Sequence, residues 1–309
     1  MIACMEKLTS ILVVVERGAT HHHALRKACV LARHFGARLE LFLCDAEHAY
    51  ALRHSYDRHG VAEARNACIG DARLFLDALR KSLGAADIDI QLDAACESPL
   101  HEGIVHKVLR SRPDMVVKSL GPFLTAADWH LIRTCPTPLM LARGNTWQPQ
   151  PKFAAAVDVS DEETPGLARS IVHTGEYLSL GCSGALEILH GARLHVPEST
   201  RVALSELAVQ FRVPPEGVHL LEGEPAKTLP HFAAERQYDV VVMGALTHRQ
   251  AFTALVGTLT GTLVDSLACD IVFIKPATFA CPLAAAPPAR REAGDTPRPA
   301  SRIPNGARA

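Results

Sequence analysis

Residues 238–276 read YDVVVMGALTHRQAFTALVGTLTGTLVDSLACDIVFIKP. An apolar strand over 239–243 leads into a loop that opens at Gly244 and ends at Gly257 and Thr258. A helix and a second apolar strand follow. The backbone amides of such a loop and the positive end of the next helix dipole both attract an anion. The stretch therefore predicts a strand, loop and helix that cradle a phosphate.

Apolar runs typical of buried parallel strands alternate with helical patterns on both sides of this unit. The order is complete by residue 143 and restarts at 153, which indicates a tandem duplication. Alternation of this kind predicts an α/β fold with right-handed crossovers. A polar loop is expected at 50–60. The strands are expected at 10–16, 38–44, 88–95, 114–120 and 139–142, and at 154–158, 185–190, 218–222, 239–243 and 271–274.

Composition divides the 309 residues into four parts. We expect a first domain over 1–146, a linker over 147–152 and a second domain over 153–277. The remaining part, 278–309, is rich in proline, alanine and arginine and has few bulky apolar residues. Such a segment buries too little surface to offset its ordering entropy, so we expect a disordered tail, or alternatively a basic arm.

Charge and cysteine usage narrow the class of protein. The net charge is -1, which favours neither nucleic acid nor a membrane surface as a partner. The nine cysteines are scattered without a C-x-x-C pair, a pattern typical of buried thiols in a reducing compartment and not of a zinc site. No apolar window is long enough for a membrane span, and no signal peptide is evident. We expect a cytoplasmic protein.

Candidate ligand-binding residues lie where the strands of the second half end. In a doubly wound sheet, ligands bind past the carboxyl ends of the strands, where the strand order reverses. Asp158 ends the first expected strand, His190 and Gly191 the second, and Met243 and Gly244 the fourth. A carboxylate at this edge can accept hydrogen bonds from a ribose, so Asp158 is a candidate nucleotide ligand. The alternative is that Asp158 caps the following helix.

The loop over 244–258 resembles the G-x2-G-x9-G-(S/T) loop of nucleotide-binding members of the universal stress protein family. Gly244, Gly257 and Thr258 keep this spacing, whereas Thr247 replaces the second glycine. A β-branched residue is strained where glycine adopts positive φ, which weakens a phosphate site. The resemblance implies two tandem domains of this family, each a five-stranded parallel doubly wound sheet in the order 3-2-1-4-5 with helices on both faces.

The same resemblance assigns roles in the second half. Asp158 takes the position of the family's adenosine-binding aspartate, and the phosphates of an ATP-like nucleotide, with Mg²⁺, lie along the loop. Met243 and Leu259 line the pocket. His248 and Arg249 are either cations beside the phosphates or solvent-exposed loop charges.

The first half has lost the features of this loop. Glu16 stands where the aspartate is expected, and the segment that starts at Gly121 and Pro122 lacks the second glycine. We expect no nucleotide there. The run DWHLIRTCPTP at 128–138 resembles the DWHLLRKCPSP run of tandem members of the family. The resemblance covers residues 8–276.

Two further clusters contain residue types that occur in metal or catalytic sites. The histidines at 21–23 could bind a metal, but adjacent positions at a helix start point in different directions. Asp128, His130 and Cys135 could form a catalytic set, but an acid in a first helical turn is ordinary dipole compensation. We expect no metal and no catalytic residues.

The sequence therefore predicts a non-enzymatic stress-response protein that binds a nucleotide or another small ligand and acts through protein partners. The alternatives are a weak nucleotide-hydrolysing or nucleotide-transferring enzyme, and a tandem protein without a nucleotide site. Residues 244–262 contain no Asp or Glu to hold a metal, which counts against the enzyme. The halves are expected to pair within the chain through 139–142 and 271–274, with Trp129 and Trp147 packed between them. A homodimer remains open.

Overall fold

The computed structural model describes residues 5, 7–19, 21–54, 58–159, 166–192, 196–245 and 256–284, and gives the backbone alone at 58–59 and 256–259. The elements of the first half are β1 (Ser10–Val14), α1 (His23–Phe35), β2 (Arg38–Cys44), α2 (Ala46–Arg53), α3 (Arg58–Ser82), β3 (Ile90–Ala95), α4 (Leu100–Ser111), β4 (Met115–Ser119), α5 (Ala126–Thr134) and β5 (Leu139–Ala142). The elements of the second half are β6 (Lys152–Ala156), α6 (Leu167–Gly181), β7 (Ala185–Ala192), α7 (Glu198–Gln210), η1 (Pro215–Gly217), β8 (Val218–Glu222), α8 (Pro225–Arg236), β9 (Val240–Gly244), α9 (Val256–Ser266), β10 (Asp270–Ile274) and η2 (Pro282–Ala284).

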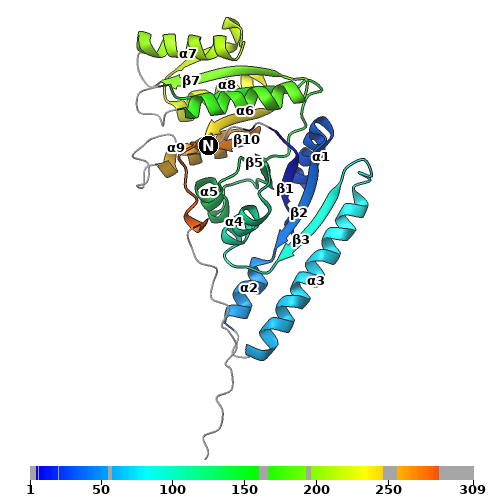
Figure 1. Cartoon of the computed structure of the whole chain (residues 1–309). Coiled ribbons are helices and arrows are strands. Elements are labelled where there is room, and N and C mark those ends of the chain that lie inside the picture. Colours follow the sequence, from blue (N-terminus) through cyan, green and yellow to red (C-terminus); the bar gives the residue numbers. More distant parts are fainter. Residues whose placement is uncertain are drawn as a thin grey trace, which may run out of the picture.

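The ten strands form one sheet in the order β3-β2-β1-β4-β5-β10-β9-β6-β7-β8. Within each half the order is 3-2-1-4-5 and neighbouring strands are parallel, which confirms the predicted fold class. The last strands of the halves, β5 and β10, pair antiparallel, with Val272 opposite Met140. The central sheet therefore runs without interruption from one half into the other (Figure 1).

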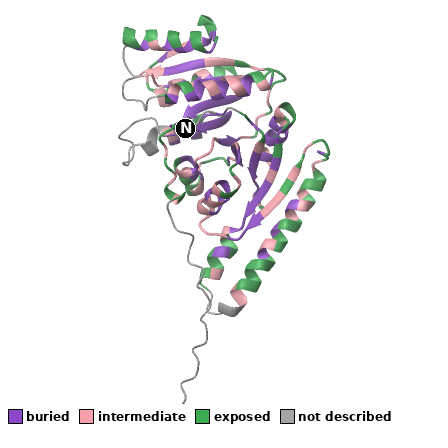
Figure 2. Ribbon diagram, in the orientation of Figure 1, coloured by how far each residue is buried: buried purple, intermediate pink, exposed green. Residues whose placement is uncertain are grey.

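Helices cover both faces of the sheet. One core cluster joins the strands to α1, α3, α6 and α7, and a second joins them to α4, α5, α8 and α9. Because both faces are covered, the central strands are largely buried, as Figure 2 shows, and most of their residues are consecutive apolar ones instead of alternating apolar and polar ones.

Aromatic side chains join the halves on each face of the sheet. Phe35 of α1 stacks on Tyr177 of α6 with ring centroids 5.1 Å apart. A Cβ at Gly181 would lie 2.1 Å from the ring of Phe35, so only glycine fits at this crossing. On the other face, a Cβ at Gly261 of α9 would lie 2.5 Å from Trp129 of α5. Trp129 thus packs between the halves, as predicted.

A buried ion pair connects the halves next to the antiparallel joint. Asp270 of β10 is fully buried and lies 2.9 Å from Nζ of Lys27 in α1. The carboxylate also accepts hydrogen bonds from the backbone N–H of Arg143 and from Nε1 of Trp147, both at 2.6 Å. Burial lowers the pKa of Lys27 and raises the pKa of Asp270, while the attraction between the two opposes both shifts. Trp147 is therefore the second tryptophan that contacts both halves.

The structure corrects the sequence analysis in three places. Residues 46–53 form α2, which begins directly after β2 and overlaps the loop expected at 50–60. The first strands of the halves end at Val14 and Ala156, two residues before Glu16 and Asp158. The segment 278–284, placed in the disordered tail, contains η2, and Cys281 and Leu283 pack against the core. The rest of the expected tail, 285–309, lies outside the described residues.

Candidate functional site

The strand order of the second half reverses between β6 and β9. These strands are parallel neighbours, with Ala156 opposite Met243. The last ladder bond of β6 runs from the N–H of Val157 to the carbonyl of Leu189, so Asp158 lies just past the sheet edge. Gly244 is the last residue of β9. Asp158 and Gly244 thus flank the switch point, where ligands bind in sheets of this type.

His190 and Gly191 lie at the same edge but have structural contacts of their own. β7 continues to Ala192, so both residues are still within the strand. The His190 ring is buried, and its Nδ1 donates a hydrogen bond of 3.0 Å to the carbonyl of Val157, which holds the segment that carries Asp158. A Cβ at Gly191 would lie 3.1 Å from Pro225, so this glycine allows the close approach of α8.

The remaining predicted residues follow β9. Gly257, Thr258 and Leu259 lie in the first turn of α9, where backbone N–H groups have no partner within the helix. Thr247 and His248 lie outside the described residues. Met243 is 7% exposed and belongs to the core cluster under α8 and α9. Strand order therefore brings Asp158, Met243 and Gly244 together.

The switch point of the first half is occupied by a network of charges. Lys118 lies opposite Val14 in the pairing of β1 with β4. Its Nζ is 2.8 Å from Glu16 and 3.0 Å from Asp128 of α5, and it donates to the carbonyl of Ser119 at 3.2 Å. The Lys118 and Asp128 side chains are buried. Lys118 was not predicted from the sequence, although a cation inside the otherwise apolar run MVVKSL could have indicated it.

Residues 152–275 match the model of the universal stress protein family. Over 91% of its length, the chain is 26% identical to Universal stress protein E of Photorhabdus laumondii, covering 99% of that protein. It is 24% identical to Universal stress protein E of Escherichia coli K12 over 90% of this chain and 98% of that one. The second half thus matches the universal stress protein family, and the chain as a whole is similar to Universal stress protein E. The solved structure of PA1789 from Pseudomonas aeruginosa PAO1 superposes with a TM-score of 0.68 at 23% identity and covers 88% of this chain and 94% of that one. The structure of a universal stress protein from Archaeoglobus fulgidus superposes with a TM-score of 0.65 at 12% identity and covers 86% of this chain and 98% of that one.

Electrostatics keep Lys118 of the first half charged. Burial lowers the pKa of the Lys118 ammonium, but the charges of Asp128 and Glu16 raise it by more, so the pKa lies above its ordinary value. Both carboxylates at this switch point are therefore paired with the buried ammonium. The absence of a nucleotide from the first half stays a prediction, and the network provides a physical reason for it.

The side chains of the two other candidate clusters do not come together in a common site. Asp128 belongs to the capping box of α5 with Thr125, His130 stacks on His101 with ring centroids 4.2 Å apart, and the Cys135 thiol contacts the carbonyl of Thr137. They form no catalytic set. Nor do the histidines at 21–23 form a three-ligand group within the described ranges. Among the helices of the described residues, none has the length and apolar character that crossing a bilayer requires.

Proposed function

We propose that this protein binds an ATP-like nucleotide, or another small ligand, at the switch point of its second half. The observation that supports this most is a difference between the two switch points. Lys118 fills the first switch point with a buried ammonium, whereas the corresponding position of the second is the apolar Met243. A ligand at the first switch point would have to displace paired charges, whereas a ligand at the second would contact the apolar side chain of Met243.

Three features of the second half suit a nucleotide. Asp158 stands at the sheet edge, where a carboxylate accepts hydrogen bonds from ribose hydroxyls. The first turn of α9 carries Gly257 and Thr258, whose backbone N–H groups and helix dipole favour a phosphate. Met243 supplies an apolar surface for the adenine. Mg²⁺ would neutralise the phosphates.

The proposed role is ligand binding and signalling to protein partners, without catalysis. Phosphoryl transfer needs a carboxylate or another group that orients a metal and the attacking water. Residues 244–262 contain no Asp or Glu. A weak nucleotide-hydrolysing or nucleotide-transferring activity is the competing function, and a tandem protein without a nucleotide site is the other.

Calorimetric titration of the full chain with ATP and Mg²⁺ tests the proposal. We expect one site per chain. Gly257→Val is expected to abolish binding by obstructing the approach of the phosphates, and Met243→Lys to weaken it at least tenfold, because an ammonium there would pair with Asp158 as Lys118 pairs with Glu16. Glu16→Gln, in the first half, and Met243→Leu should leave the affinity unchanged.

The outcome separates the competing functions. No heat at millimolar ATP would overturn the nucleotide site, and equal binding by wild type and Gly257→Val would place the ligand elsewhere. Release of inorganic phosphate from ATP in the same sample, absent in Gly257→Val, would establish the enzyme in place of the binding module.

A further inference from the structure

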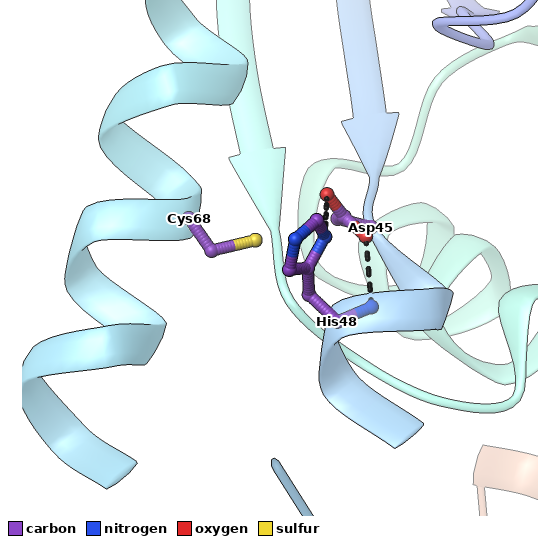
Figure 3. Close-up of side chains that lie close together, drawn as sticks. All are labelled: Asp45, His48 and Cys68. Carbon is purple, nitrogen blue, oxygen red and sulfur yellow. Dashed lines mark hydrogen bonds and ion pairs between the residues drawn. The ribbon is translucent and has the colours of Figure 1, made fainter. Parts of the chain in front are cut away.

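Three potential metal ligands converge at the far edge of the first half, away from the proposed nucleotide site. Asp45 follows β2 and caps α2, His48 lies in the first turn of α2, and Cys68 projects from α3. Donor atoms of the three side chains all lie within 4.8 Å of one another, and no other such group occurs in the part of the chain that the structure describes. Figure 3 shows the Cys68 sulfur pointing toward the His48 ring, which is held by Asp45.

The fold holds two of these ligands in place. Asp45 is 8% exposed, and its backbone N–H donates a hydrogen bond of 2.8 Å to the carbonyl of Ala95, which ties it to the end of β3. Its side chain accepts hydrogen bonds from the backbone N–H of His48 at 3.1 Å and from Nδ1 of His48 at 2.9 Å. Cys68 is also 8% exposed. Only the His48 ring, with its side chain 70% exposed, faces solvent.

The donor set selects a metal. A thiolate, an imidazole and a carboxylate together suit Zn²⁺, whereas Ca²⁺ and Mg²⁺ require oxygen ligands. Donors around a tetrahedral zinc ion lie about 3.3–3.8 Å apart, given metal–ligand bonds of about 2.0–2.3 Å, so the separations here need to close by at most about 1 Å. We propose that Asp45, His48 and Cys68 bind one Zn²⁺ ion, which leaves the fourth position to water or a further ligand.

Charge balance supports the proposal. One thiolate and one carboxylate neutralise Zn²⁺, and the Cys68 proton is released to solvent as the metal binds. Arg17 Nε lies 3.9 Å from Oδ2 of Asp45, the same oxygen that accepts from Nδ1 of His48.

The same residue types could be interpreted as a Cys-His-Asp catalytic triad. A catalytic cysteine needs a depressed pKa and access for substrate. Cys68 is buried and packs in a small cluster with Ala49 and Cys96, which leaves no access for a substrate. These observations favour a metal ligand, because a metal deprotonates a buried thiol directly.

Bound zinc would connect elements that the hydrophobic core joins weakly. It would clamp α2 onto α3 and both onto the ends of β2 and β3, at the free edge of the sheet where those helices extend away from the second half (Figure 1). The proposed role is therefore a structural clamp on α2, independent of the nucleotide site.

Cobalt titration tests the site in the full chain, stripped with EDTA and kept reduced so that Cys68 and Cys96 cannot form a disulfide. Cobalt bound to a thiolate absorbs strongly in the near ultraviolet, and Co²⁺ shares the ligand preferences of Zn²⁺. We expect one equivalent of Co²⁺ to give this band and one equivalent of Zn²⁺ to remove it. His48→Ala and Cys68→Ser should each weaken binding at least about tenfold.

Matched variants separate this cluster from other thiols and histidines. Cys182→Ser changes another buried thiol, and His231→Ala changes another exposed histidine paired with an acid on its own helix. Both should bind cobalt as wild type does. The proposal fails if no thiolate band appears, or if the band survives in Cys68→Ser. His48→Ala keeps the test valid if Cys68→Ser does not fold, because His48 is exposed.

Discussion

Lys118 in β4 and Met243 in β9 occupy the same position in the two halves. Lys118 lies opposite Val14 and Met243 opposite Ala156, and each of those partners precedes an acid by two residues. The duplicated sheet thus presents two switch points of the same backbone geometry. At the first switch point a buried ammonium is paired with two carboxylates, whereas at the second the same position holds the thioether of Met243. This difference is the physical reason for proposing that the ligand binds in the second half.

Replacing the buried lysine should destabilise the first half. Lys118→Met leaves Asp128, which is fully buried, without its cation. Removing one partner of a buried ion pair typically lowers the free energy of unfolding by about 3–5 kcal/mol. Urea unfolding of Lys118→Met measures this loss. The double variant Lys118→Met/Asp128→Asn should recover part of it, because no buried charge then remains. A double variant no more stable than the single one would contradict this account.

The ion pair between the halves is the second target. Asp270→Asn removes the counter-charge of Lys27 and weakens the hydrogen bonds from Trp147 and Arg143. We expect the free energy of unfolding to fall by about 3–5 kcal/mol. Asp87→Asn, which breaks a solvent-exposed pair with Arg33, should lower it far less, because water screens that pair. Equal urea midpoints for the two variants would show that the contact between the halves does not depend on Asp270.

Lys275 makes the stability depend on pH in the alkaline range. This residue follows β10, donates hydrogen bonds to the carbonyls of Ile132 and Cys135 at the end of α5, and is 3% exposed. Burial lowers its pKa from 10.5 to about 8, against the opposing effect of Cys135 and Cys281. Below pH 8 the folded protein holds a charged, buried ammonium. Between about pH 8 and 10.5 the unfolded chain binds more protons, so the contribution of Lys275 to stability rises with pH.

Urea unfolding of wild type and Lys275→Met at pH 7.5 and 10 measures that contribution. The difference in the free energy of unfolding should shift in favour of wild type by an amount on the order of 2–3 kcal/mol. Titration of cysteines that do not contact Lys275 is common to both proteins and cancels in the difference. A difference that does not change with pH would mean that Lys275 keeps an ordinary pKa.

The strands and their parallel pairing could be predicted because they depend on a local pattern and on duplication, whereas the order 3-2-1-4-5 came from the resemblance to a known family. Continuous apolar runs such as 139–142 and 271–274 report burial on both faces, and their alternation with helices predicts parallel neighbours. Asp158 and Gly244 could be placed at the switch point for the same reason. The helix α2 was missed, because its single buried residue, Ala49, gives too weak an apolar periodicity.

The sequence by itself determined the duplicated α/β architecture and, through the resemblance of its loop to that of a known family, the strand order and the edge at which Asp158, Met243 and Gly244 meet. Only the tertiary structure decided that Lys118 fills the first switch point, that Asp270 pairs with Lys27 across the halves, and that Asp45, His48 and Cys68 converge. Periodicity records how each segment faces water or core. It carries no information about which charged or metal-binding side chains from distant elements come within bonding distance, because that depends on how the helices pack over the finished sheet.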